Sequence, residues 1–204
     1  MSKDYIEIEL TKGKVALIDK EDKDKVLKWY GKKPTTWYAS VMNAYGDNPR
    51  YNEISYVYAE KRLTPKQQNY INENYPGILK PKKNGGTTKN LLLHRFVMEA
   101  PHDMFVDHIN GNTLDCRKEN LRLCTFQQNC QNRKKRSDSR HKYIGISKRH
   151  SDWNLKKPWR GCVKHLGKNY YTECFKTEYE AAKARDELAK KMRGEFARLN
   201  FPDE

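Results

Sequence analysis

The chain of 204 residues contains no uninterrupted apolar run of the length that crosses a lipid bilayer. Its first stretch, MSKDYIEIEL, carries acidic residues where a secretory signal has an apolar core. We therefore expect a cytoplasmic protein with no membrane partner. Apolar residues make up only 36% of the chain and charged residues 33%. This composition predicts several small modules rather than one large core.

Cysteine is also scarce, and the spacing of the cysteines does not indicate a metal site. The five cysteines are Cys116, Cys124, Cys130, Cys162 and Cys174. No two of them have the C-x-x-C spacing that a zinc ribbon needs, so zinc is not expected. Their odd number and the absence of an export signal predict reduced thiols.

Acidic residues are rare in one segment, residues 133–170, which holds 13 Lys and Arg but 2 Asp and Glu. Residues 1–90 have a net charge of +6, while residues 91–132 and 171–204 each have −1. A cluster of cations this dense predicts a polyanionic partner, and double-stranded DNA is the one we favour. RNA and an anionic membrane are alternatives, although the segment lacks the amphipathic pattern of a membrane-surface helix.

The first part of the sequence, residues 1–90, is expected to be an N-terminal α+β region. The stretches YIEIEL, KGKVALID and TWYASVM have the composition of short strands. Thr64 and Pro65 open a plausible helix in TPKQQNYINENY. The turn signals GDNP, YPG and KPKKNGG predict a loop-rich insertion at residues 46–90.

The last part of the sequence follows a basic linker at residues 133–142. Three short strands separated by glycine turns are predicted in YIGISKRHSDWN and KPWRGCVKHLGKNYYTECF. A helix then begins with a capping box of Thr177 and Glu180 and ends at Gly194. The predicted buried face of this helix comprises Ala181, Ala184, Leu188 and Met192. Residues 143–204 are thus expected to form a three-stranded antiparallel sheet packed on one helix.

The central stretch, VDHINGNTLDCRKENLRLCTFQQNCQNR, places Asp107 and His108 side by side. Hydrolysis of a phosphodiester needs a base to take a proton from water, and His can do this near neutral pH. It also needs positive charge at the phosphate, and carboxylate and amide oxygens are suitable ligands for Mg²⁺ or Mn²⁺. A helix after Thr125 would present Asn129 and Asn132 on one face. These residues alone do not distinguish a catalytic site from a simple turn, because Asn-Gly is a common turn sequence.

The same stretch resembles the ββα-metal core (His-Me finger) of phage-type HNH homing endonucleases, over residues 91–132. The resemblance implies that Asp107 is a metal ligand, His108 the general base and Asn129 the second metal ligand. It also implies that Asn120 holds the loop by hydrogen bonds and that one Mg²⁺ or Mn²⁺ is bound.

Two further residues of this core are Cys116 and His94. Cys116 stands where the family has a polar residue, often Asn, so the hydrogen bonds inside the loop are expected to differ. His94 lies within NLLLHRFVMEA, an apolar run that suits a strand or a helix. A structural role is favoured for His94 over a catalytic one.

The C-terminal residues 143–204 resemble the plant ethylene-response-factor (Apetala-type) DNA-binding domain, in YIGISKRH, PWRGCV, TECFKTEYEAAKARDELAKKMRG and ARLNFP. The resemblance implies a sheet that enters the major groove, which admits such a ribbon. The expected DNA contacts are Arg133, Lys134, Lys135, Arg136, Lys148, Arg149, Trp159, Arg160 and Lys164. Arg160 suits guanine because its guanidinium is a planar fork, whereas packing remains an equal alternative for Trp159. The insertion SDWNLKKP departs from the compact hairpin of that family.

The sequence therefore predicts an α+β protein of small modules that acts as a site-specific, homing-type DNA endonuclease. The products expected from the resemblance are 5′-phosphate and 3′-hydroxyl ends, and a monomer is expected because the chain has one such core. If the chain is phage-encoded, it would act in the bacterial cytosol. Two alternatives stay open: a DNA-binding regulator with an inactive core, and an RNA-binding accessory protein.

Overall fold

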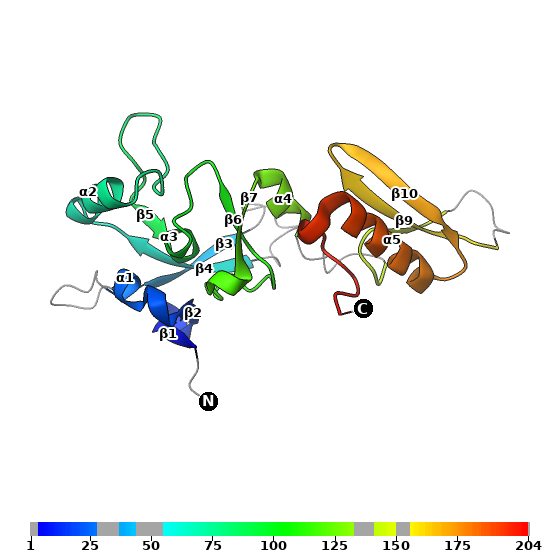
Figure 1. Cartoon of the computed structure of the whole chain (residues 1–204), viewed down its shortest axis with the longest axis horizontal. Helices are drawn as coiled ribbons and strands as arrows, with labels where there is room; N and C mark the ends of the chain where they lie inside the picture. The colour runs from blue at the N-terminus through cyan, green and yellow to red at the C-terminus, as the bar shows by residue number, and fades with distance from the viewer. Residues whose placement is uncertain (1–3, 28–36, 44–54, 133–140, 150–155, 204) are drawn as a thin grey trace. The chain divides into compact units, whose positions relative to one another are not determined.

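The computed structural model describes residues 4–27, 37–43, 55–132, 141–149 and 156–203 (Figure 1). They form two compact units, Met1–Phe126 and Gln127–Glu204. Both units combine helices and strands, so the expected α+β class is confirmed. Within the described ranges, no helix is both long and apolar enough to span a membrane.

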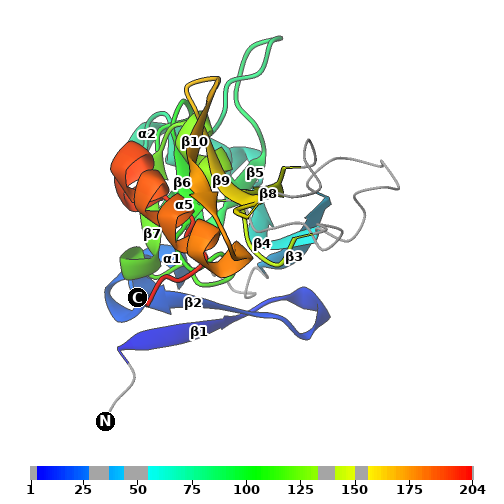
Figure 2. The same cartoon turned by 90° about the vertical axis from the view of Figure 1, so that its right-hand side faces the viewer.

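The first unit begins with an antiparallel hairpin of β1 (Tyr5–Glu9) and β2 (Val15–Asp19). Figure 2 shows this hairpin near the N-terminus. A short 3₁₀ turn, η2 (Lys20–Asp22), leads into α1 (Lys23–Leu27). The inward-facing side chains Ile8, Ala16 and Ile18 are buried, because alternation along a strand places every second residue on the core side. The two strands predicted here are confirmed.

A three-stranded antiparallel sheet follows, built from β3 (Tyr38–Asn43), β4 (Ser55–Arg62) and β5 (Asn90–Leu92), with β4 in the centre. The helix α2 (Pro65–Asn74) begins with the expected cap, in which Thr64 accepts a hydrogen bond from the Gln67 backbone. The helix predicted after Thr64 is thus confirmed, whereas the prediction of a loop-rich insertion at residues 46–90 did not anticipate β4. Local turn signals could not reveal β4, because its stability comes from pairing on both edges.

The expected division between residues 90 and 91 does not match the fold. The run NLLLHRFVM is both strand and helix, since β5 leads directly into α3 (Leu93–Val97). β5 pairs with β4, and one buried core extends from Ile8 through Trp37 and Phe96 to Leu121. The N-terminal region and most of residues 91–132, here called the HNH-like segment, therefore share one core rather than forming separate domains.

The HNH-like segment contains β6 (Phe105–His108), β7 (Leu121–Cys124) and α4 (Phe126–Gln131), in that order. β6 and β7 are antiparallel, and the 3₁₀ turn η4 (Lys118–Asn120) precedes β7. The two strands and the helix agree with the sequence prediction. Asn132 lies just beyond the end of α4, and its backbone N–H donates to the Asn129 carbonyl at 3.3 Å.

The second unit contains an antiparallel sheet in the order β10-β9-β8, covered on one face by α5 (Figure 2). The elements are β8 (Ile146–Lys148), β9 (Trp159–His165), β10 (Lys168–Phe175) and α5 (Glu178–Arg193). Thr177 and Glu180 form the predicted capping box, and Gly194 ends the helix at φ 56°. The predicted sheet of three strands with one helix is confirmed.

The buried face of α5 differs from the predicted one. Its buried residues are Ala181, Ala182, Arg185, Asp186 and Ala189. Arg185 and Asp186 are inside because Arg185 Nη1 donates to Asp186 Oδ1 at 2.9 Å, and both also bind the C-terminal segment. Apolar periodicity excludes charged residues from a core, so it could not anticipate a buried ion pair.

Candidate active site

Asp107 and His108 lie at the end of β6, and both are buried, with 5% of each residue exposed. Asp107 is directly opposite Arg122 in the β6–β7 pair. The Arg122 Nε and Nη2 atoms donate to Asp107 Oδ2 at 2.9 and 2.7 Å. The carboxylate is thereby held in one orientation and compensated by a cation, which a buried charge requires.

Three rings from different elements meet at His108. The His108 and His94 ring centroids are 5.0 Å apart with the rings nearly perpendicular, and Tyr58 lies 5.3 Å from His94 and 6.3 Å from His108. Tyr58 comes from β4 and His94 from α3. Edge-to-face contacts of this kind restrict ring rotation. His94 thus packs directly against the candidate base.

Burial keeps both histidines neutral. It lowers the pKa of His108 from 6.5 to about 4, although the charges of Asp107 and Asp115 oppose this change. Burial also lowers the pKa of His94 well below its usual value, and the His108 ring adds to this effect. A neutral imidazole at neutral pH retains a nitrogen lone pair that can accept a proton.

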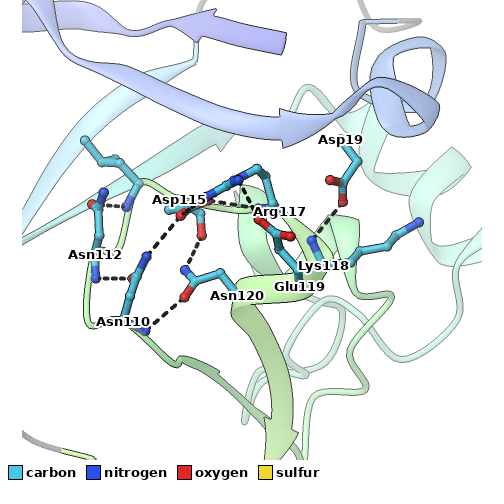
Figure 3. Close-up of polar contacts among 9 residues, drawn as sticks. Asp19, Asn110, Asn112, Asp115, Arg117, Lys118, Glu119 and Asn120 are labelled. Carbon is cyan, nitrogen blue, oxygen red and sulfur yellow. Dashed lines mark hydrogen bonds and ion pairs between the residues drawn. The ribbon is translucent and has the colours of Figure 1, made fainter. Parts of the chain in front are cut away.

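The loop after His108 is fixed by amide side chains (Figure 3). Asn120 Oδ1 accepts from the Asn110 backbone N–H at 2.9 Å, and Asn120 Nδ2 donates to the Asp115 carbonyl at 2.8 Å. Asn110 Nδ2 donates to Asp115 Oδ2 at 3.0 Å, and Asn110 Oδ1 accepts from the Asn112 N–H at 2.7 Å. Asn120 is buried, so it is placed as the loop-holding role requires.

Asp115 is the charged centre of this network. Arg117 Nε and Nη2 donate to its two carboxylate oxygens at 2.8 and 2.7 Å, a fork-to-fork ion pair (Figure 3). These hydrogen bonds from Arg117 lower the pKa of Asp115, which keeps the carboxylate ionised. The buried loop thus has a permanent negative charge with a matched partner.

The N-terminal hairpin holds the same loop from outside. The Leu17 N–H donates to the Leu114 carbonyl and the Cys116 N–H donates to the Leu17 carbonyl, each at 2.8 Å. The Lys118 N–H donates to Asp19 Oδ2 at 2.8 Å (Figure 3). Cys116 is fully buried in the core, and burial raises the pKa of its thiol to about 12. Cys116 therefore serves as a small apolar residue, and backbone pairing with β2 orders the loop around it.

The start of α4 is fixed within the first unit by the Phe126 ring, whose centroid is 5.5 Å from that of Phe105 on β6. Asn129 follows one turn later on α4 and belongs to the second unit. Asp107 belongs to the first unit. Both offer hard oxygen donors of the kind that Mg²⁺ and Mn²⁺ accept.

No group of three or more His, Cys, Asp or Glu side chains suited to a metal occurs in the part of the chain that the structure describes. Of the two residues assigned as ligands, Asp107 offers a carboxylate in the first unit and Asn129 an amide oxygen in the second. Mg²⁺ commonly binds through one or two carboxylates together with waters and substrate phosphate oxygens. This donor set is chemically suited to such an ion.

In the second unit, the expected DNA contacts divide between the two faces of the sheet. A Cβ on Gly161 would meet Arg185 and the Ala181 carbonyl, so Gly161 faces α5. Since side chains alternate along a strand, Arg160 and Lys164 point to the opposite face, here called the outer face. Tyr171 shares it and is half exposed, with the Arg160 guanidinium 4.2 Å from its ring centroid.

Arg149 also reaches the outer face, where its Nη1 lies 3.8 Å from Cys174 Sγ. Trp159, by contrast, packs against the core on the α5 side, and Lys148 Nζ lies 5.7 Å from its ring centroid. Trp159 is partly buried in this packing, and a DNA contact by it stays a prediction. The expected contacts Arg133, Lys134, Lys135 and Arg136 lie outside the described residues.

Sequence reasoning missed Tyr58, Arg122 and Asp115. Arg122 could have been found by aligning the two strands around the loop, because that register places it opposite Asp107. Asp115 lies inside the quoted motif, but the sequence gives no sign that Arg117 pairs with it. Nothing local marks Tyr58, which reaches the histidines only through the tertiary fold.

The chain is similar to known proteins over part of its length. An uncharacterized HNH endonuclease of Acanthamoeba polyphaga mimivirus is 34% identical over 117 residues, which are 54% of this chain and 58% of that protein. The chain thus spans less than two thirds of that relative. No solved structure matches the chain. Residues 92–131 match the sequence model of the family described as HNH endonuclease, and they therefore form an HNH endonuclease family domain.

Proposed function

We propose that this protein is a site-specific, homing-type DNA endonuclease that hydrolyses one phosphodiester bond per catalytic event. The observation that carries the proposal is the buried neutral His108 beside Asp107, in a loop fixed by Asn110, Asp115 and Asn120. The HNH family domain at residues 92–131 supports the same activity.

His108 acts as the general base in this proposal. Its neutral ring takes the proton of the attacking water, and the contacts from His94 and Tyr58 hold the ring in place. The negative charge of a DNA phosphate brought to the site raises the pKa of His108 again, which improves it as a base. The products carry 5′-phosphate and 3′-hydroxyl ends.

Asp107 would supply an oxygen ligand to one divalent ion, Mg²⁺ or Mn²⁺, in the first unit. When bound, the ion supplies positive charge that polarises the phosphate and stabilises the leaving oxygen. Arg122 orients the Asp107 carboxylate through Oδ2. We further propose that the outer face of the second unit binds DNA through Arg149, Arg160 and Lys164, as the likeness to ethylene-response-factor domains implies.

The test is cleavage of genomic DNA by the purified full chain with Mg²⁺ or Mn²⁺, with the ends mapped by sequencing. His108→Ala removes the base, so we expect cleavage to fall by about 10²–10⁴-fold. Binding in EDTA should be unchanged. The matched control is His102→Ala, since His102 is an exposed histidine of the same unit. Full cleavage by His108→Ala would contradict the assigned base.

One observation favours a second candidate, a DNA-binding regulator with an inactive core. The Arg122 guanidinium already compensates the charge of Asp107, and this competes with a metal ion for the carboxylate. If the regulator is correct, neither metal will produce breaks, while salt-sensitive retention of particular DNA fragments persists.

A further inference from the structure

A second basic surface occurs in the first unit, apart from the cation-rich segment of the second. Residues 74–98 contain no Asp or Glu, while four lysines fall within residues 80–89, here called the lysine arm. The arm lysines are Lys80, Lys82, Lys83 and Lys89. All four are exposed, and Figure 1 shows the segment between α2 and β5 extending away from the sheet. Nothing in the HNH motif accounts for it.

These lysines differ from the other lysines around the core. Lys25 pairs with Glu99 at 2.7 Å, and Lys118 lies between Glu21 and Asp22. Within the described ranges, the structure shows no ion pair between an arm lysine and a carboxylate. Cations gathered without acids create a local positive potential that attracts a polyanion. The paired lysines stabilise the fold, whereas the arm lysines remain available to a partner.

The lysine arm is an ordered hairpin rather than a loose loop. Pro81 bridges Thr87, the Lys82 N–H donates to the Gly86 carbonyl at 3.0 Å, and the Thr88 N–H donates to the Lys80 carbonyl at 2.8 Å. The corner needs φ of 84° and 70° at its two glycines, 85 and 86, which glycine adopts without strain. The lysines are therefore displayed on a preformed scaffold, which lowers the entropic cost of binding.

The helix α2 anchors this scaffold. Gln68 Nε2 donates to both the Thr87 carbonyl and Thr87 Oγ1 at 2.8 Å, and Asn72 Nδ2 donates to the same hydroxyl at 3.3 Å. The Leu63 N–H donates to the Lys89 carbonyl at 2.7 Å and closes the base of the arm next to β4. The arm thus has a fixed position relative to the strand that carries Tyr58.

That position separates the lysine arm from the candidate active site. Tyr58 contacts the two histidines, and Arg62, at the base of the arm, is four residues further along β4. At about 3.3 Å per residue, this separation is about 13 Å. It corresponds to roughly four base pairs of DNA, at about 3.4 Å each.

We propose that the lysine arm binds the phosphate backbone of the DNA duplex, a few base pairs away from the scissile bond. This inference rests on the proposed function and adds to it a DNA contact in the catalytic unit itself. The arm supplies affinity and register independently of base sequence, because lysine ammonium groups meet phosphates as point charges.

The experiment measures binding of the full chain to a labelled mixed-sequence duplex in EDTA over a range of salt concentrations. The test variant is K80Q/K82Q/K83Q. The matched control is K12Q/K14Q/K23Q, which removes the same number of exposed lysines from the same unit. We expect the arm variant to bind about tenfold more weakly at low salt, with a salt slope shallower by about 0.9 per lost phosphate contact. The control should bind like the wild type.

The second measurement is the single-turnover cleavage rate at saturating DNA, which the arm variant should leave unchanged because the lysines lie away from the bond. If the arm variant and the control bind duplex DNA equally well, the inference is wrong, whether or not the protein cuts. If instead the variant loses affinity for an RNA duplex and not for DNA, the arm is an RNA contact and the inference is equally wrong. Absence of cleavage by the wild type, with arm-dependent DNA binding, would reject the nuclease but keep the arm.

Discussion

The candidate active site and the outer face of the second unit use their charges in opposite ways. Around the candidate active site, Asp107 pairs with Arg122 and Asp115 with Arg117, and all four groups are buried or largely covered. On the outer face of the second unit, Arg149 and Lys164 are exposed, and Arg160 stacks on an exposed tyrosine ring. Charges in the first arrangement fix a geometry, while those in the second are available to a polyanion.

The second unit also has an arrangement of the first kind, on its inner side. Asp186 accepts hydrogen bonds from Arg185, from Asn200 Nδ2 at 3.0 Å and from the Phe201 N–H at 3.0 Å. This network ties the C-terminal segment to α5. Paired, buried charges that fix the fold and exposed cations that can bind a polyanion therefore occur on different faces of the same unit. Four experiments can test this contrast.

The largest effect is expected from Asp186→Ala. The substitution leaves the buried Arg185 charge without its partner, so we expect the second unit to lose about 3–5 kcal/mol of stability. Urea unfolding followed by tryptophan fluorescence measures this loss. The control is Glu187→Ala, whose exposed ion pair with Lys190 should contribute less than about 1 kcal/mol. Equal stability of both variants would show that Asp186 does not fix the fold.

Acid should destabilise the first unit next most strongly. The pKa of His108 falls from 6.5 to about 4 on folding. Below about pH 6.5, His108 is protonated in the unfolded chain but stays neutral in the folded protein. The free energy of unfolding therefore decreases as the pH falls to about 4, by up to about 3 kcal/mol. His94 acts in the same direction. Urea unfolding in EDTA should show this decrease, and it should be smaller in His94→Gln but unchanged in His102→Gln.

A smaller effect is expected at Tyr58. Tyr58→Leu removes the ring that packs against His94 and His108, and an aromatic contact is worth about 0.5–1.5 kcal/mol. We expect the cleavage rate at saturating DNA to fall by up to about tenfold, with KM unchanged. Tyr58→Phe keeps the ring and should restore the rate. A change in KM alone would place Tyr58 at the DNA rather than behind the base.

The smallest effect is expected on the outer face. Arg149→Gln combined with Lys164→Gln should leave stability unchanged within about 0.5 kcal/mol, because both side chains are exposed. Duplex binding should weaken, and its salt slope should become shallower by about 0.9 per lost contact. The control is Lys183→Gln together with Lys191→Gln, two exposed lysines of α5 on the other side of the sheet. Equal binding by the two double variants would remove the outer face as a DNA surface.

Local patterns in the sequence predicted a good part of the fold. The Thr64 and Thr177 caps, the hairpin at the N-terminus and the strand-strand-helix order at residues 105–131 are present in the structure. These features depend on short-range chemistry, such as a hydroxyl near the backbone N–H groups it caps. The Asp-His pair was likewise visible, because the two residues are adjacent.

Long-range contacts escaped prediction. The turn signals around β4 predicted a loop, although β4 is the central strand of its sheet. A domain boundary was predicted after residue 90, although β5, which begins at Asn90, pairs with β4 and completes that sheet. In both cases the stabilising hydrogen bonds come from strands far away in sequence, and no local composition reveals them.

The sequence by itself therefore determined the chemical groups of this protein: the base, the carboxylate, the loop amides and the excess of cations. Only the tertiary structure decided their environment. It buried His108 against His94 and Tyr58, placed Arg122 on Asp107, packed Trp159 against the core of the second unit and, among the residues that the structure describes, left the arm lysines without acidic partners. The physical reason is that pKa, orientation and availability depend on neighbours in space, which chain order alone does not give.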